Sequence, residues 1–101
     1  MIVYNVTIKI QNSVREEWVR YMQQQHIPDV LNTGCFTAYR FHHLLEQDDA
    51  EDTTYVIQYI AHDIETYFRY RDTYAPGLQA DVAKHFGDKF VSFRTLMEQL
   101  V

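Results

Sequence analysis

Hydrophobic and polar residues alternate over residues 2–10, at the start of the chain. One side of this stretch carries Ile2, Tyr4, Val6, Ile8 and Ile10, and the other carries Val3, Asn5, Thr7 and Lys9. A period of two is typical of a β-strand, because successive side chains point to opposite faces of a sheet. The pattern therefore predicts a strand over residues 2–10 with one face in the core.

A helical spacing replaces the alternation after residue 12. Ser13 and Glu16 have the spacing of a capping box, in which each side chain accepts a hydrogen bond from the other residue's backbone N–H. A residue before proline is disfavoured in the α region, so we expect this helix to end near residues 26–28. A turn or short helix then continues to Gly34. The buried stripe of the helix is predicted to comprise Val14, Trp18, Tyr21 and Met22.

Three more strands and a second helical region follow. Residues 35–45 and 53–61 predict the two strands of a hairpin that is joined across an acidic stretch, and residues 89–96 predict the last strand. The helical region starts with Asp63 as its N-cap and is interrupted at Pro76. The element order is therefore βαββαβ.

A short repeat relates the two halves of this order. Residues 18–21 precede a proline at position 28, and the similar residues 67–70 precede a proline at position 76. Two strand–helix–strand halves that meet at a hairpin are typical of the ferredoxin-like plait. This α+β fold has a four-stranded antiparallel sheet with helices on one face. A chain of 101 residues is long enough for one core, so we expect a single domain over residues 1–101.

The alternation in each predicted strand assigns its residues to the two faces of the sheet. Toward the helices we place Tyr4, Val6, Ile8, Tyr39, Phe41, Tyr55, Ile57, Tyr59, Val91 and Phe93. On the opposite face we place Asn5, Thr7, Lys9, Arg40, His42, Gln58, Ser92 and Arg94, interleaved with Phe36, Ala38, Leu44, Val56, Ile60, Phe90 and Leu96. If the hairpin folds about residue 49, Arg40 lies directly opposite Gln58.

The second face of the sheet has no helices to cover it in a plait. A face with this many apolar residues is covered most simply by a second copy of the chain, which predicts a homodimer through the open sheet face. In such a dimer Arg40, Gln58 and Arg94, with His42 beside them, could line a cavity that favours a carboxylate or phosphate ligand. The alternative is that each arginine pairs with an acidic residue of the partner chain or reaches solvent at the rim.

The composition indicates which classes of partner and which cellular compartment to expect. The nine Lys and Arg residues are scattered and the formal net charge is −5, which argues against nucleic-acid binding, because phosphate neutralisation needs clustered cations. No segment has the run of about 18 to 20 apolar residues that spans a bilayer, so we expect no membrane partner. Cys35 is the only cysteine and has no partner for an intramolecular disulfide, which favours a reducing cytoplasm.

Strong catalytic motifs are absent. The chain has no phosphate-cradling Gly-rich loop, nucleophile elbow, C-x-x-C or H-E-x-x-H motif, and we expect no cofactor. The adjacent His42 and His43 point to opposite faces of a strand and cannot share one metal ion, so no metal site is predicted.

His26 and His42 are the weak candidates for a general base. His26 follows an aromatic helix, and the walls of a pocket beside it could be formed by Trp18, Tyr21 and Tyr39. The alternative for His26 is a structural one, in which the imidazole stabilises the C-terminal end of the helix.

Specific segments support a family resemblance. They are residues 1–7 (MIVYNVT), Trp18, 26–30 (HIPDV), 33–36 (TGCF), 39–40 (YR), 58–59 (QY), 75–76 (AP) and 90–95 (FVSFRT). With these segments the chain resembles, over nearly its whole length, a family of bacterial proteins classed as a domain of unknown function. The resemblance implies a ferredoxin-like domain of the dimeric α/β-barrel kind and no assigned activity. More distantly, this architecture is similar to cofactor-independent monooxygenases and EthD-like proteins.

Three functions stay open at this point. The first is a homodimer that binds a small, anionic molecule through Arg40, Gln58, Arg94 and His42. The second is an enzyme like the cofactor-independent monooxygenases or the EthD proteins, with His26 or His42 as the base. The third is a structural dimerisation module.

Overall fold

The computed structural model describes residues 1–101 and has four strands and four α-helices. The strands are β1 (Ile2–Gln11), β2 (Ala38–His43), β3 (Asp52–Ala61) and β4 (Phe90–Glu98). The helices are α1 (Arg15–Tyr21), α2 (Ile27–Asn32), α3 (Ile64–Arg69) and α4 (Ala75–Phe86). A 3₁₀ turn at Asn12–Val14 precedes α1, and π-helical turns at Met22–His26 and Tyr70–Tyr74 join the helices in pairs.

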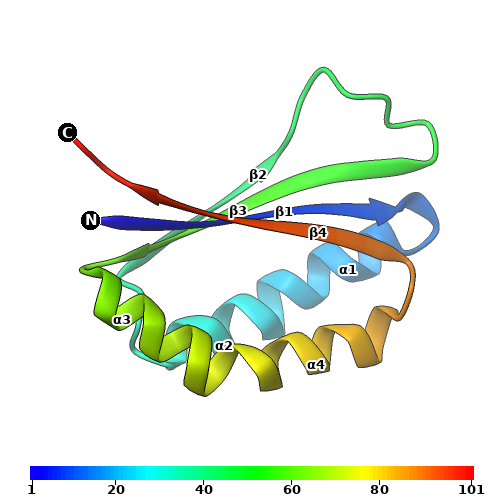
Figure 1. Ribbon diagram of the computed structural model, residues 1–101. Helices are drawn as coiled ribbons and strands as arrows, with labels where there is room; N and C mark the ends of the chain where they lie inside the picture. Colours follow the sequence, from blue (N-terminus) through cyan, green and yellow to red (C-terminus); the bar gives the residue numbers. More distant parts are fainter.

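The sheet has the order β2-β3-β1-β4, and all neighbouring strands are antiparallel. All four helices cover one face of this sheet, and the two chain termini lie side by side at one end (Figure 1). This arrangement confirms the predicted ferredoxin-like α+β fold. The predicted pairing of Arg40 with Gln58 is confirmed as well.

The core lies between the sheet and the helices. All five residues of the predicted inner face of β1 are buried, as the alternation indicated. Opposite them, the two helical pairs contribute the buried side chains Trp18, Met22, Ile27, Val30, Tyr70, Ala75, Val82 and Phe86. The apolar stripes of the helices and of the central strand thus pack into one core.

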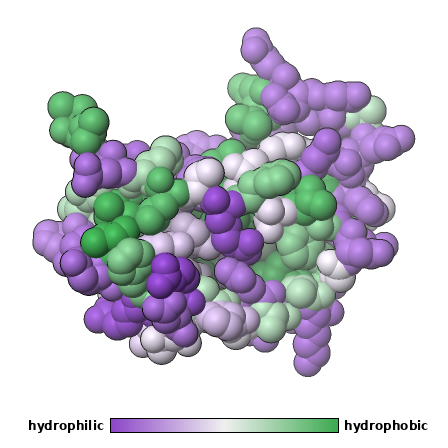
Figure 2. Space-filling model, viewed as in Figure 1, coloured by the Kyte–Doolittle hydropathy of each residue, from purple (hydrophilic) through white to green (hydrophobic).

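The predicted faces of β4 are wrong. Arg94 pairs with Val6 and Ser92 pairs with Ile8, so both polar residues lie on the helix-facing side, together with Phe90 and Leu96. Val91 and Phe93 point to the open face instead and are 54% and 66% exposed. The alternation in β4 is ambiguous because apolar residues occur at both even-numbered and odd-numbered positions. Only the register with β1 determines which set faces the helices. Figure 2 shows hydrophobic patches interrupted by hydrophilic side chains on the side where β4 lies.

The predicted position of Phe36 is also corrected. Strand β2 starts at Ala38, three residues later than predicted, and Phe36 turns into the core before the strand begins. Its ring packs 5.2 Å from the ring of Tyr59 and 4.8 Å from that of Tyr70, measured between centroids. The alternation of side chains between two faces does not apply to Phe36, because this residue is not part of a strand.

Both helical regions continue through their prolines. The first was expected to end near residues 26–28, but its π-helical turn leads directly into α2. In each half the residue before the proline donates its N–H to the carbonyl five residues earlier, Ile27 to Met22 and Ala75 to Tyr70. The wider turn accommodates the proline that follows. The sequence repeat therefore corresponds to a repeated backbone feature.

The helix starts differ from each other. Asp63 caps α3 as predicted, because its Oδ1 accepts hydrogen bonds from the backbone N–H and the hydroxyl of Thr66 at 2.9 and 2.6 Å. The predicted capping box of Ser13 and Glu16 is wrong, since no side chain caps the first helix. A 3₁₀ turn over Asn12–Val14 occupies this position instead.

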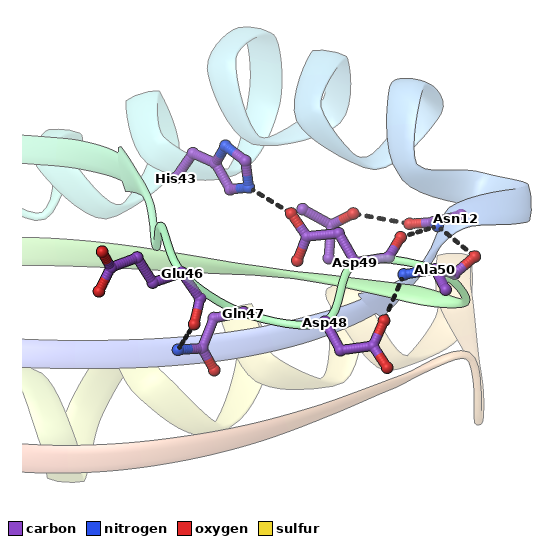
Figure 3. A network of polar contacts seen from close by, with 8 residues as sticks. Asn12, His43, Glu46, Gln47, Asp48, Asp49 and Ala50 are labelled. Atoms are coloured by element: carbon purple, nitrogen blue, oxygen red, sulfur yellow. Dashed lines mark hydrogen bonds and ion pairs between the residues drawn. The ribbon is translucent and has the colours of Figure 1, made fainter.

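The acidic loop between β2 and β3 rises on the side of the sheet that the helices leave open (Figure 1). Asn12 anchors it: the side-chain amide donates to the carbonyl of Asp49 at 2.8 Å and accepts from the hydroxyl of Thr53 at 2.6 Å (Figure 3). At the end of β2, Nε2 of His43 lies 2.9 Å from Oδ2 of Asp49 in the loop. The loop is thus tied to the end of β1.

We expect the substitution Asn12→Ala to destabilise the protein by about 1 to 3 kcal/mol. It leaves the hydroxyl of Thr53, which is fully buried, without its partner and releases the loop. Urea denaturation measures the change. The double variant Asn12→Ala/Thr53→Val is the control, because removing both partners restores part of the loss. Equal stability of Asn12→Ala and the wild type would contradict the anchoring role.

Candidate functional site

The structure divides the site that was predicted on one sheet face. Arg40, Gln58 and His42 lie on the open face, where the Gln58 amide donates to Oδ1 of Asn5 at 3.3 Å and Arg40 is exposed. Arg94 lies on the other side of the sheet, under the helices. Within one chain, the two arginines therefore cannot bind the same ligand.

Arg94 instead lines a cavity between the sheet and the helices. The volume open to the centre of a water-sized sphere is about 40 Å³, which is room for a few water molecules. Ten of the fourteen lining residues are hydrophobic. The strands contribute Tyr4, Val6, Ile8, Ile57, Tyr59, Phe90, Ser92 and Arg94, and the helical regions contribute Trp18, Met22, His26, Tyr70, Gln79 and Val82.

Arg94 is the only residue with a fixed charge in this lining. Its Nε donates to the hydroxyl of Tyr4 at 3.1 Å, and its Nη1 donates to the hydroxyl of Ser92 at 3.2 Å. No carboxylate forms an ion pair with it. Because β4 is an edge strand and Arg94 is exposed to solvent, its guanidinium stands at the mouth of the cavity with capacity for an anion.

His26 reaches the same cavity from the π-helical turn between α1 and α2. Burial lowers the pKa of His26 to about 4, with Arg94 acting in the same direction and Asp29 and Asp81 opposing it. The imidazole is therefore neutral at pH 7, and its buried Nδ1 has no hydrogen-bond partner in the chain. A neutral ring contributes little to the helix dipole, which weakens the structural alternative for this residue.

Two further polar atoms in the lining lack a partner within the chain, Nε1 of Trp18 and the hydroxyl of Tyr59. Burial is the largest influence on the Tyr59 hydroxyl and raises its pKa, so this group stays protonated and can donate. Sequence reasoning assigned both residues to the core or to a pocket wall. No local signal could have revealed their unpaired donors, because pairing depends on neighbours that come from other segments of the chain.

The remaining chemical candidates stand apart from this cavity. His42 is exposed on the open face, and His43 contacts the acidic loop. No group of three or more His, Cys, Asp or Glu residues is arranged to hold a metal ion. None of the helices combines the length and the apolar character that crossing a membrane requires.

Comparison with known proteins identifies one family. The family model described as "Domain of unknown function (DUF4286)" matches residues 1–100. A comparison with functionally curated proteins finds no match.

Solved structures show the same fold. An EthD family protein from Bacillus halodurans matches at a TM-score of 0.70 and 13% identity, covering 99% of this chain and 100% of that chain. HapK from Hahella chejuensis matches at 0.73 and 15%, covering 99% and 93%. SnoaB, a cofactor-independent oxygenase from Streptomyces nogalater, matches at 0.71 and 14%, covering 99% and 94%. These identities establish the fold alone, which is that of dimeric α/β-barrel proteins.

Proposed function

The chain belongs to the DUF4286 family of domains of unknown function, and we propose that it is a homodimeric protein that binds a small anionic molecule in its cavity. Arg94 provides the charge that holds the anion, and His26, Ser92 and the tyrosines shape the pocket around it. The proposal keeps the predicted class of ligand and moves the site from the open sheet face to the space under the helices.

The observation that carries this proposal is the bonding of Arg94. A guanidinium group has five N–H donors, and Arg94 uses two of them, both on neutral hydroxyl groups. Its counter-charge does not come from this chain. A carboxylate or phosphate at the cavity mouth would accept the remaining N–H groups in a bidentate pair, and the apolar lining would enclose the rest of the ligand.

The open sheet face supports the homodimer. Val91 and Phe93 expose more than half of their surface there, and Met97 from the same strand is 43% exposed. The acidic β2–β3 loop stands on the open face of the sheet. The side chains of Lys9 and Arg40 also lie on this face, so the surface carries both negative and positive charges. A surface of this kind can pair with its own copy about a twofold axis. Light scattering should give twice the 12.1 kDa of the chain, and a mass of one chain would contradict the dimer.

Substitution of Arg94 tests the ligand site. Titration calorimetry with benzoate, acetate and inorganic phosphate identifies an anion that binds the wild type. We expect Arg94→Gln to weaken that binding by about 10-fold to 100-fold, the value of a hydrogen bond to a charged group. Arg40→Gln is the matched control, since Arg40 faces the other side of the sheet. Loss of binding in Arg40→Gln with retention in Arg94→Gln would return the site to the open face.

One observation favours a second candidate function, a cofactor-independent oxygenase or EthD-like enzyme. His26 places an unpaired Nδ1 in the same cavity as Arg94, so a proton acceptor and a group that stabilises a developing anion are both present. The low pKa of His26 makes it a weak base at pH 7, which ranks this function below ligand binding. Turnover that disappears in His26→Gln, with ligand affinity retained, would reverse the ranking.

A further inference from the structure

Unpaired polar atoms are concentrated in the cavity. Four buried side-chain nitrogen or oxygen atoms have no hydrogen-bond partner in the chain, and three of them line it: Nε1 of Trp18, Nδ1 of His26 and the hydroxyl of Tyr59. The fourth, on Asp49, belongs to the acidic loop. In native proteins nearly all buried polar groups form hydrogen bonds. Three exceptions in one cavity therefore indicate a ligand that forms the missing hydrogen bonds.

Two of these atoms belong to side chains that are almost completely enclosed. Trp18 is 0% exposed and Tyr59 is 2% exposed. An indole nitrogen can only donate a hydrogen bond, and a protonated phenol donates readily. The cavity therefore has two enclosed donors in its lining, and each of them can bind an acceptor oxygen.

The donors and Arg94 enter the cavity from different sides. Tyr59 lies on β3 and Arg94 lies on β4, which are the two neighbours of β1, so the strands that carry them are about 10 Å apart. Trp18 enters from α1, where its ring packs 5.1 Å from the ring of Tyr55 of β3. One end of a ligand would thus contact the guanidinium of Arg94, and the other end would contact neutral hydrogen-bond donors.

We propose, building on the anion site above, that the ligand is an organic acid with a second polar group, a carbonyl or hydroxyl oxygen. Arg94 binds the carboxylate at the mouth, and Tyr59 or Trp18 donates to the second oxygen in the enclosed part of the cavity. The body between them is apolar, because Val6, Ile57 and Val82 line the space around it. The cavity selects compact acids that carry a hydroxyl or carbonyl oxygen. An acid without this oxygen leaves both buried donors unpaired.

Matched pairs of acids test the selection. Titration calorimetry compares propionate with lactate and pyruvate, whose size suits the small volume of the cavity. We expect at least one hydroxy or oxo acid to bind the wild type about tenfold tighter than its parent acid, the value of one to two hydrogen bonds. Tyr59→Phe and Trp18→Phe should reduce this preference. Tyr39→Phe should retain it, because Tyr39 is the cross-strand neighbour of Tyr59, is 46% exposed and does not line the cavity.

The outcomes separate the two proposals. Binding that depends on Arg94 but shows no preference for any hydroxy or oxo acid overturns this inference and leaves the anion site standing. Binding that is indifferent to Arg94→Gln overturns the anion site itself. Absence of binding by every acid in the set overturns the class of ligand proposed here.

The melting temperature of the free protein adds a second readout. Removal of an unpaired buried hydroxyl should leave the melting temperature of Tyr59→Phe equal to or above that of the wild type. A lower melting temperature combined with an unchanged preference would mean that the hydroxyl has a structural role, and would overturn its assignment to the ligand.

Discussion

Acidification from pH 7 to pH 4 should destabilise the protein by about 3 kcal/mol through His26 alone. The pKa of this group is about 4 in the folded chain, against 6.5 for a histidine that is fully exposed to water, as in the unfolded chain. Between these values the unfolded state binds a proton that the folded state does not bind. The contribution of this residue is therefore complete above about pH 7, falls as the pH decreases from 6.5 to 4, and levels off below pH 4.

Urea denaturation at pH 7, 5.5 and 4 measures this dependence in the wild type and in His26→Gln. The glutamine keeps polar atoms at the position and cannot be protonated, so its stability should fall less over the same range. His62→Gln, at an exposed position, is the control and should follow the wild type. Carboxylates titrate in all three proteins, so the difference between variants is the quantity to compare. Parallel curves for His26→Gln and the wild type would show that the imidazole is accessible to protons in the fold.

The substitution Phe93→Glu should convert the proposed dimer to a monomer. Phe93 is 66% exposed on the open face and pairs with Thr7 of β1, so it stands where a second copy would cover it. In a twofold interface one substitution introduces two charges. At about 3 kcal/mol for each buried, unpaired charge, the dimer dissociation constant should rise by about four orders of magnitude.

Analytical ultracentrifugation over a range of concentrations measures this change. Phe68→Glu is the matched control, because Phe68 is 39% exposed on α3 and lies on the helical side of the molecule. It adds the same charge and should leave the dimer intact. A dimer that survives Phe93→Glu and dissociates in Phe68→Glu would place the interface on the helices.

The position of the candidate site was predictable only in part. His26 and Arg94 were both recognised from the sequence, but as members of two separate sites, one beside the first helix and one on the open sheet face. The structure brings them to one cavity because the register of β4 turns Arg94 toward the helices. Tyr59 and Trp18 were recognised only as apolar surface. Their missing partners are a property of the assembled interior.

The sequence by itself determined the order of elements, the inner face of β1, the cap at Asp63 and the pairing of Arg40 with Gln58. Each of these depends on residues close together in the chain or on a clear period of two, so local chemistry suffices. Only the tertiary structure decided which face of β4 is buried and which side chains share the cavity. Apolar residues occupy both parities of that strand, so its orientation depends on hydrogen bonds to β1, a strand about ninety residues away in the chain. The cavity combines Trp18, His26, Tyr59 and Arg94, which no local pattern connects.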